Sequence, residues 1–295
     1  MMVVFLVLLG VMGGGYHPAA SPLVSASVEP KNRGRALGLH QIGGTASFFL
    51  SPLIAVAIAT ALGWRGSFVA LAIPTIVFGI VFYWVLGRRG YTKKTEHEMP
   101  NSHTAAPSTT SHLRRLVPFI TLGVAIQVLL FSTISFIPLF VVDHFGAGEE
   151  VAAALLALIH STGLWAGPLG GYLSDRIGRV PVILAVSVIA GPIIYLLTLV
   201  SFGWSISLVL LAMGMSMYIG MPVSEAYIIS HTSGRNRSMI LGIYYFASRG
   251  GSGVIMPVIG YLIDRVGFSN SFAIVSAALI VVTIGCSIFL WRSRD

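Results

Sequence analysis

The feature that most constrains this chain is a series of long apolar segments. A helix needs about 20 apolar residues to cross the hydrocarbon layer of a membrane. Nine segments fit, and we predict spans at 3–28, 38–62, 67–87, 115–141, 150–172, 181–201, 205–230, 238–263 and 270–291. Charged residues make up 9% of the chain, against about 25% in soluble domains. The sequence therefore predicts an all-α, multi-pass membrane protein with the lipid bilayer as its solvent.

The basic residues predict an orientation. A net charge of +8 would suggest nucleic acid as a partner in a soluble protein. Here the charges lie in short loops, as the positive-inside rule requires, so we expect no nucleic-acid partner. One set of loops holds Lys31, Arg33, Arg35, Arg88, Arg89, Lys93, Lys94, Arg114, Arg115, Arg176, Arg179, Arg235, Arg237, Arg292 and Arg294, whereas the opposite set holds Arg65 and Arg265. This bias predicts an inner-membrane protein whose linker and C-terminus are cytoplasmic.

One long polar stretch divides the chain. Residues 88–114 are basic at both ends and rich in Ser, Thr, Pro and His between them, a composition typical of linkers. We predict three helices in 1–87, a cytoplasmic linker at 88–114 and a complete six-helix bundle in 115–295.

An internal repeat relates the two ends of the chain. Shifted by 204 residues, Pro18 falls on Pro222, Arg33 on Arg237, Gly38 on Gly242, Gly63 on Gly267 and Arg88 on Arg292. The first three predicted spans therefore match the last three. The spans within 115–201 have no counterpart in the chain, because a segment 204 residues earlier would lie before residue 1. We expect a six-plus-six parent protein that has roughly 90 further residues on the N-terminal side.

A shorter repeat lies inside the second half. Gly171-Tyr-Leu-Ser-Asp-Arg-Ile-Gly178 recurs as Gly260-Tyr-Leu-Ile-Asp-Arg-Val-Gly267. Three predicted spans separate the copies, so they end spans on opposite sides of the membrane. This pattern indicates the nested three-plus-three inverted repeat of many transporters.

These motifs resemble the major facilitator superfamily. The segment 171–179 is similar to that family's G-x-L-x-D-R-x-G-R loop, Arg33–Gly38 to its R-G-x-x-x-G junction, and Gly63–Phe68 to its G-W-R-x-x-F turn. The resemblance implies helices four to twelve of an MFS-type bundle, monomeric when full length. It also implies a gating motif comprising Arg33, Arg35, Gly171, Asp175, Arg176, Gly178 and Arg179. Gly171 would permit close helix approach, and Asp175 would meet the positive N-terminus of a neighbouring helix.

Finer likenesses concern transport chemistry. The family's antiporter signature on helix five matches at Gly38 and Pro52, but Ser47, Ser51 and Ala55 replace its other glycines. This departure weakens the case for drug or proton antiport. The stretch Gly15–Pro18 is similar to fosmidomycin-resistance-type exporters.

Two charged residues fall at membrane depth. A charge in hydrocarbon costs about 2.5–3.5 kcal/mol on insertion scales, so Glu225 and Arg249 each require a reason. One hypothesis is a structural ion pair between them. The other is transport, in which Glu225 binds a proton or cationic substrate, or Arg249 an anionic one.

Further polar and aromatic residues complete the predicted substrate and proton pathway. His17 and His160 lie near the middle of spans, and histidine titrates near physiological pH. The other members are His40, Gln41, Gln127, Tyr218 and Tyr245. The resemblance implies that helices one, four, seven and ten line the cavity, which favours His17, Gln127, Tyr218 and Glu225.

The motif search favours transport over catalysis. The sequence contains no P-loop, no G-x-S-x-G elbow and no zinc-ligand pair, so we predict no enzyme, no cofactor and no metal. The predicted function is secondary transport of a small solute by alternating access, coupled to protons. The alternative is a non-transporting membrane sensor or an inactive transporter fragment.

Overall fold

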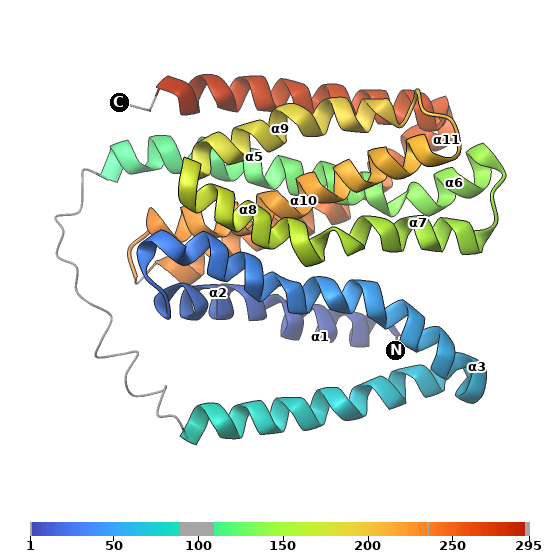
Figure 1. Ribbon diagram of the computed structural model, residues 1–295, viewed down its shortest axis with the longest axis horizontal. Coiled ribbons are helices and arrows are strands. Elements are labelled where there is room, and N and C mark those ends of the chain that lie inside the picture. The colour runs from blue at the N-terminus through green and yellow to red at the C-terminus, as the bar shows by residue number, and fades with distance from the viewer. Residues whose placement is uncertain (1, 89–108, 235, 293–295) are drawn as a thin grey trace. The chain divides into compact units, whose positions relative to one another are not determined.

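The computed structural model describes residues 2–88, 109–234 and 236–292, and the regular elements in those ranges are helical (Figure 1). They are α1 (Met2–Gly14), α2 (Tyr16–Ala26), η1 (Pro30–Asn32), α3 (Arg33–Arg88), α5 (Thr109–Ser135), α6 (Ile137–Phe145), α7 (Glu149–Ser161), α8 (Gly163–Ile177), α9 (Arg179–Leu196), α10 (Trp204–Ser230) and α11 (Arg237–Arg292). The all-helical prediction is confirmed for these ranges. Most of the predicted linker, with Arg89, Lys93 and Lys94, lies outside the described residues, as do Arg235 and Arg294.

Six helical stretches in the described ranges are long and apolar enough to cross a membrane. They are Arg65–Val85, Leu116–Ser135, Glu149–Ile177, Arg179–Leu196, Trp204–Ser230 and Arg237–Leu290. The chain is thus a multi-pass membrane protein, whereas the count of nine spans is not confirmed. Part of the difference lies in α11, where 54 residues form one stretch. A straight helix of that length would be about 80 Å long, far beyond the roughly 30 Å of hydrocarbon.

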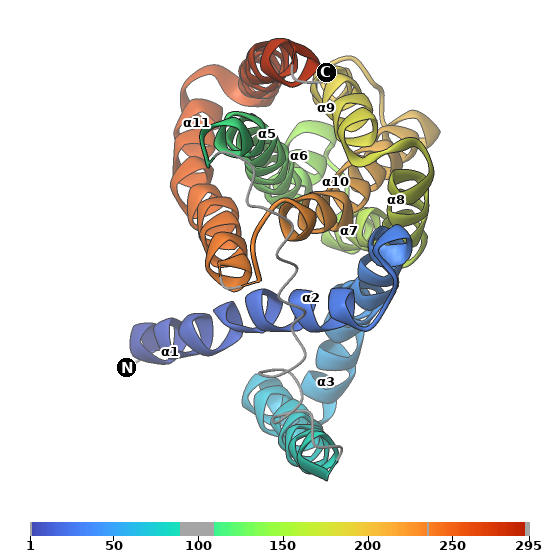
Figure 2. The same ribbon diagram turned by 90° about the vertical axis from the view of Figure 1, so that its left-hand side faces the viewer.

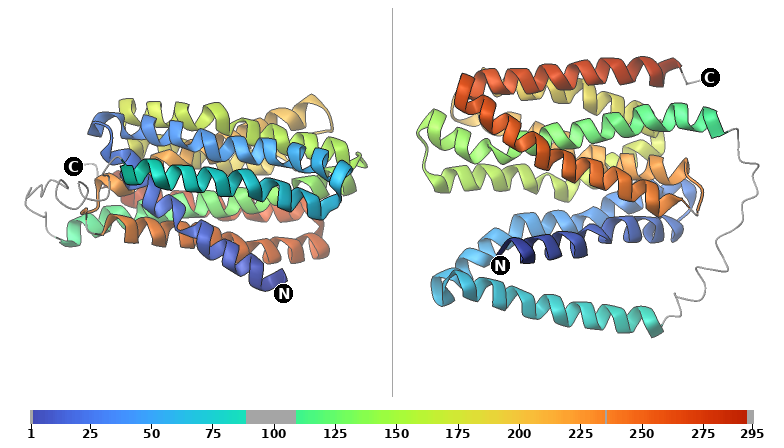
Figure 3. Two further views of the ribbon diagram at one scale, coloured as in Figure 1. Left: turned by 90° about the horizontal axis from the view of Figure 1, so that it is seen from below. Right: turned by 180° about the vertical axis from the view of Figure 1, so that it is seen from behind.

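Glycines break the two longest helices at equivalent places. Both α3 and α11 have 56 residues, and their backbones leave helical geometry at Gly63 (φ 70°, ψ 168°) and Gly267 (φ 80°, ψ 171°). Positive φ is accessible to glycine without steric cost. The breaks give α11 a first arm before Gly267 and a second arm after it (Figure 3). The 204-residue repeat read from the sequence is therefore also present in the backbone.

Prolines divide other predicted spans. The predicted span 3–28 contains both α1 and α2, which meet at Gly15, and 115–141 reaches from α5 into α6, which meet at Phe136. Pro18 and Pro138 follow these junctions. Each lacks the N–H that would continue the helical hydrogen bonding. Membrane helices tolerate such interruptions when neighbours supply partners.

Contacts divide the chain into two units. One consists of Met1–Ala46 with Thr109–Asp295, and the other of Ser47–Ser108. Of the described side chains of Arg65–Val85 in the second unit, that of Ser67 is buried and the others are exposed or half-buried. The predicted division into bundles 1–87 and 115–295 stays a prediction.

The core of the first unit lies among α5, α9, α10 and α11, which pack on one another (Figure 2). Phe119 of α5 stacks on Tyr227 of α10 with ring centres 3.7 Å apart. Ser276 of α11 donates a hydrogen bond to the Gly191 carbonyl of α9 at 2.8 Å. Because lipid tails are as apolar as these side chains, close packing and interhelical hydrogen bonds hold such helices together.

Candidate functional site

A buried carboxylate joins four helices of the first unit. Glu225 of α10 has none of its surface exposed. Its Oε2 accepts a hydrogen bond from Ser21 Oγ of α2 at 2.7 Å. Its Oε1 accepts one from Gln41 Nε2 of α3 at 3.2 Å and another from the Tyr245 hydroxyl of α11. All three partners act as donors, which suits an ionised carboxylate because that group only accepts.

The internal repeat relates the members of this Glu225 cluster, defined as Ser21, Gln41, Glu225 and Tyr245. Ser21 and Glu225 are 204 residues apart, and so are Gln41 and Tyr245. The cluster therefore joins two pairs of residues that occupy equivalent positions in the 204-residue repeat.

Two predicted histidines lie beside the cluster. The His17 ring stacks on Tyr245 with centroids 4.8 Å apart and 21° between planes. Tyr16 meets His17 edge-on at 5.4 Å and stacks on His40 at 5.8 Å. His17 thus contacts the cluster directly, whereas His40 is connected to it through Tyr16 and then His17.

Three other residues of the predicted pathway, His160, Gln127 and Tyr218, form contacts between helices. His160 Nδ1 and the Tyr218 hydroxyl are 2.6 Å apart, which links α7 to α10. Gln127 donates to the Met217 carbonyl at 3.2 Å, which links α5 to α10. These contacts brace α10 from two further sides. Roles for these residues in transport stay predictions.

The structural ion pair between Glu225 and Arg249 is not formed in the part of the chain that the structure describes. Glu225 already accepts three hydrogen bonds, and the Arg249 guanidinium instead lies over the Phe131 ring, 5.1 Å from its centroid. Arg249 is exposed and borders a narrow pocket of about 10 Å³ that Gln127 and Tyr245 also line. Recognition of an anion by Arg249 stays a prediction.

Asp175 caps the N-terminus of α3, at the helix ends that we predict to face the cytoplasm. Its Oδ1 accepts a hydrogen bond from the Gly34 amide at 3.0 Å, and its Oδ2 accepts one from the Arg35 amide at 2.8 Å. Both amides belong to the first turn of α3, which carries partial positive charge. The contact expected for this carboxylate is present, and its role in gating stays a prediction.

Glycines bring α8 and the start of α3 into backbone contact. A Cβ added at Gly171 would lie 2.0 Å from the Gly34 carbonyl oxygen, and one added at Gly38 would lie 2.5 Å from that of Gly167. Small residues at such spacing are typical of close helix packing in membranes. Gly178, at φ 94°, ends α8 and allows α9 to begin at the next residue.

Three of the four basic residues of the gating motif, Arg35, Arg176 and Arg179, contact neutral neighbours. Arg35 and Arg176 lie 5.2 and 4.7 Å from the Tyr172 ring centroid. Arg179 donates from Nη1 to Ser230 Oγ at 2.6 Å. Arg33 and its repeat equivalent Arg237 each keep a buried Nε without a hydrogen-bond partner. This motif therefore combines a helix cap with cation–π and hydroxyl contacts.

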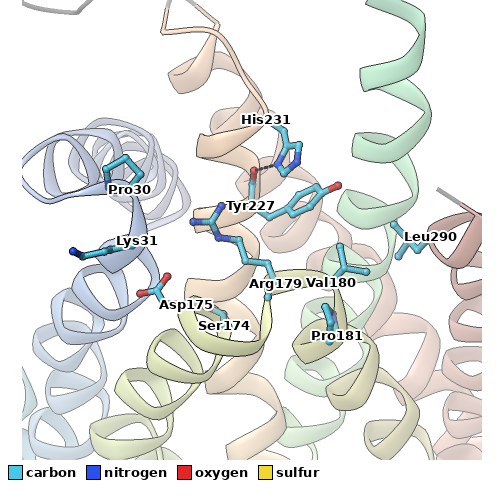
Figure 4. Close-up of a pocket in the computed structure, with 11 residues that line it drawn as sticks. Pro30, Lys31, Ser174, Asp175, Arg179, Val180, Pro181, Tyr227, His231 and Leu290 are labelled. Carbon is cyan, nitrogen blue, oxygen red and sulfur yellow. Dashed lines mark hydrogen bonds between the residues drawn. The ribbon is translucent and has the colours of Figure 1, made fainter. Parts of the chain in front are cut away.

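A pocket of about 470 Å³ lies beside these residues (Figure 4). Lys31, Asp175, Arg179, Tyr227 and His231 line its polar side. The His231 ring nitrogen Nδ1 is 2.9 Å from the Tyr227 carbonyl oxygen. The lining therefore carries charges of both signs: Lys31, which pairs with Glu29 at 2.8 Å, and Arg179 are cations, and Asp175 is a carboxylate that caps α3.

Ser21 is the member of the site that sequence reasoning missed. Serine is common in membrane helices and its residue type carries no signal. The 204-residue repeat makes Ser21 equivalent to Glu225, and this equivalence is the one sequence signal that points to Ser21.

Comparisons with known proteins place this geometry in context. The family model described as Major Facilitator Superfamily matches residues 1–221 and 152–295. The chain is 24% identical to the multidrug resistance protein MdtG of Salmonella arizonae, over 98% of this chain and 71% of that protein. The identity is also 24% to MdtG of Salmonella typhimurium, with the same coverage. MdtG of Dickeya zeae is 22% identical over 94% of this chain and 69% of its own length.

Proposed function

Because the chain belongs to the Major Facilitator Superfamily, we propose that it moves a small solute across the inner membrane by alternating access, with a proton carried by Glu225. The family and the MdtG relatives support membrane transport of a small solute. Alternating access and proton coupling go further, and rest on the chemistry of the Glu225 cluster.

The observation that carries proton coupling is the position of Glu225. The side chain is fully buried on α10 and is not ion-paired among the described residues. A carboxyl group at membrane depth is expensive and marks an ion pathway or proton relay by default. Its hydroxyl and amide partners can accommodate either protonation state. A proton is therefore the simplest cargo for this group.

The relatives suggest the class of solute. They are named multidrug resistance proteins, so we propose export of drug-like organic molecules. The likeness of Gly15–Pro18 to fosmidomycin-resistance-type exporters points the same way. His17, within that stretch, stacks on Tyr245, which places it beside the proposed proton site.

Efflux from cells that express the chain tests the proposal. Cells lacking their own drug exporters are loaded with ethidium, and efflux is followed by fluorescence with and without a pH gradient. We expect gradient-dependent efflux that Glu225→Gln reduces at least tenfold. Glu149→Gln is the matched control, because Glu149 is an exposed acid in the first turn of α7.

The variant Arg249→Ala tests the role of Arg249 independently of the role of Glu225. If Arg249 binds an anionic group of the solute, the variant raises the half-saturating concentration of anionic solutes and leaves proton release unchanged. Wild-type transport in both Glu225→Gln and Arg249→Ala would overturn the functional interpretation. Absence of transport by the parent chain itself would favour the sensor or inactive-fragment alternative.

A further inference from the structure

The Glu225 cluster lies on a boundary between the two parts of the repeat. The first block, defined as α1, α2 and residues 33–46 of α3, contributes Ser21 and Gln41. The second block, defined as α5 to α11, contributes Glu225 and Tyr245. Among the described residues, α2 packs on both α10 and α11 (Figure 2). Two of the three hydrogen bonds to Glu225 therefore cross between the blocks.

The contacts of Asp175 and the paired glycines cross the same boundary. Asp175 of α8 caps α3, and Gly167 and Gly171 of α8 meet Gly38 and Gly34 of α3. Gly34, Gly171 and Asp175 lie at the helix ends that carry the predicted cytoplasmic basic residues, and Gly38 and Gly167 lie further along the same two helices. The structure thus describes a state in which the blocks are joined at that end. Of the side chains that join them there, Glu225 is the fully buried acid.

We propose that Ser21 and Gln41 are positioning residues that make the charge of Glu225 a latch between the blocks. The ionised carboxylate accepts from both, and hydrogen bonds to a charged acceptor are about twice as strong as neutral ones. A proton bound at Glu225 removes the charge and occupies one lone pair. The contacts across the boundary weaken, and the blocks separate at this end. This inference rests on the proposed transport function and assigns its trigger.

Other titratable and charged groups surround the latch. His17 stacks on Tyr245, and Tyr16 connects His17 to His40. From α11, the charge of Arg249 acts on His17 and Tyr244, and Tyr244 interacts electrostatically with Glu225. The Glu225 substitution separates its titration from theirs, because these groups remain in the variant.

The repeat supplies an internal control. Since Ser21 and Glu225 are equivalent and in contact, a carboxylate placed at position 21 would occupy nearly the same point from the other side. The double exchange Ser21→Glu with Glu225→Ser keeps one carboxylate and one hydroxyl at the boundary. A purely structural role for Glu225 on α10 would not be rescued by this exchange.

The test measures the distance across the boundary as a function of pH. Lys31 and Ile177 are exposed, and lie in η1 and at the end of α8. Spin labels on Lys31→Cys and Ile177→Cys, in a Cys286→Ser background, report that distance by pulsed electron paramagnetic resonance in lipid nanodiscs. We expect a short distance at pH 8 that gives way to a longer one at pH 5. Glu225→Gln should show the longer distance at both pH values.

Ser21→Ala tests the positioning role. Loss of one donor to the ionised form should move the midpoint of the distance change to higher pH by about one unit, or tenfold in proton affinity. Gln41→Ala should act in the same direction. Ser25→Ala is the matched control, because Ser25 is equally buried one turn along α2 and is not bonded to Glu225. It should leave the midpoint unchanged.

The outcomes separate the latch from transport. The latch would be overturned, even if efflux persists, by a label-to-label distance that does not change with pH in the parent chain. Equal pH midpoints of the distance change in Ser21→Ala and Ser25→Ala would overturn it as well. A pH-dependent distance in a chain without efflux would support the latch and count against the transport proposal. If Glu225→Gln fails to fold in thermal unfolding, the double exchange decides. Restored pH dependence supports the latch, and its loss in a folded exchange variant refutes it.

Discussion

Replacing Gly38 with alanine tests how closely α3 and α8 depend on each other. The added Cβ would lie 2.5 Å from the Gly167 carbonyl oxygen and 2.9 Å from both Gly167 C and Pro168 Cα. Ordinary van der Waals contact begins at 3.4 Å, so the oxygen must move by about 0.9 Å. All three atoms belong to the backbone, and no side-chain rotation can relieve the clash. The two helices must therefore move apart.

The cost follows from overpacking. Inserting a methyl group into a well-packed interior costs about 1–3 kcal/mol, which shifts an equilibrium between joined and separated blocks about 5- to 150-fold. We expect Gly38→Ala to populate the longer distance between labels at 31 and 177 already at pH 8. Ethidium efflux should fall, because the joined state becomes rare.

Gly43→Ala is the control for Gly38→Ala. Gly43 lies on the same helix, and a Cβ there meets nothing within 4 Å among the described residues. Both changes gain the same helix propensity from alanine, so the difference isolates the contact with α8. Equal distance distributions in the two variants would refute the interpretation of the glycine contact.

Two further predictions concern the helix break and the helix cap. Gly267→Ala forces a residue with a side chain to adopt φ 80°, which costs about 1–3 kcal/mol, so the variant should unfold at a lower temperature than the parent. Gly285→Ala is the control and should unfold like the parent, because a Cβ there meets nothing within 4 Å among the described residues. Equal melting temperatures for the two variants would show that the break is not required. Asp175→Asn keeps an acceptor for the Gly34 or Arg35 amide but removes the negative charge at the N-terminus of α3, at a cost of about 0.3–2 kcal/mol. The ratio of joined to separated blocks at pH 8, read from the distance between labels at 31 and 177, should drop roughly 2- to 30-fold at low ionic strength and less in high salt. A drop that does not depend on salt would contradict the electrostatic account.

Much of the fold followed from periodic and compositional features of the sequence. Runs of about 20 apolar residues identify helices in lipid because a helix of that length crosses the hydrocarbon and satisfies its own backbone hydrogen bonds. The repeat register also identified Gly63 and Gly267 as equivalent positions, and the structure breaks both helices there. The number of spans was less secure, since Pro18 lies where the first predicted span divides into α1 and α2, and the single stretch Arg237–Leu290 contains two predicted spans.

The site was harder to predict because contacts depend on which helix face meets which neighbour. The sequence predicts Glu225, Gln41 and Tyr245 as site residues, with Arg249 as one candidate ionic partner of Glu225. In the structure, the carboxylate accepts hydrogen bonds from Ser21, Gln41 and Tyr245 instead. Opposite charge at similar depth was a poor guide, because neutral donors at closer range can satisfy a carboxylate fully.

The contact between Ser21 and Glu225 has a consequence for how such a protein can arise by duplication. In two identical copies, a residue beside the axis faces its own duplicate, as in a symmetric dimer. Two carboxylates there would repel each other in a medium of low dielectric, and one would have to stay neutral. A single acid becomes available only after one copy has changed. The hydroxyl at position 21 is thus a counterpart that spares Glu225 a second carboxylate at the point where the two copies touch.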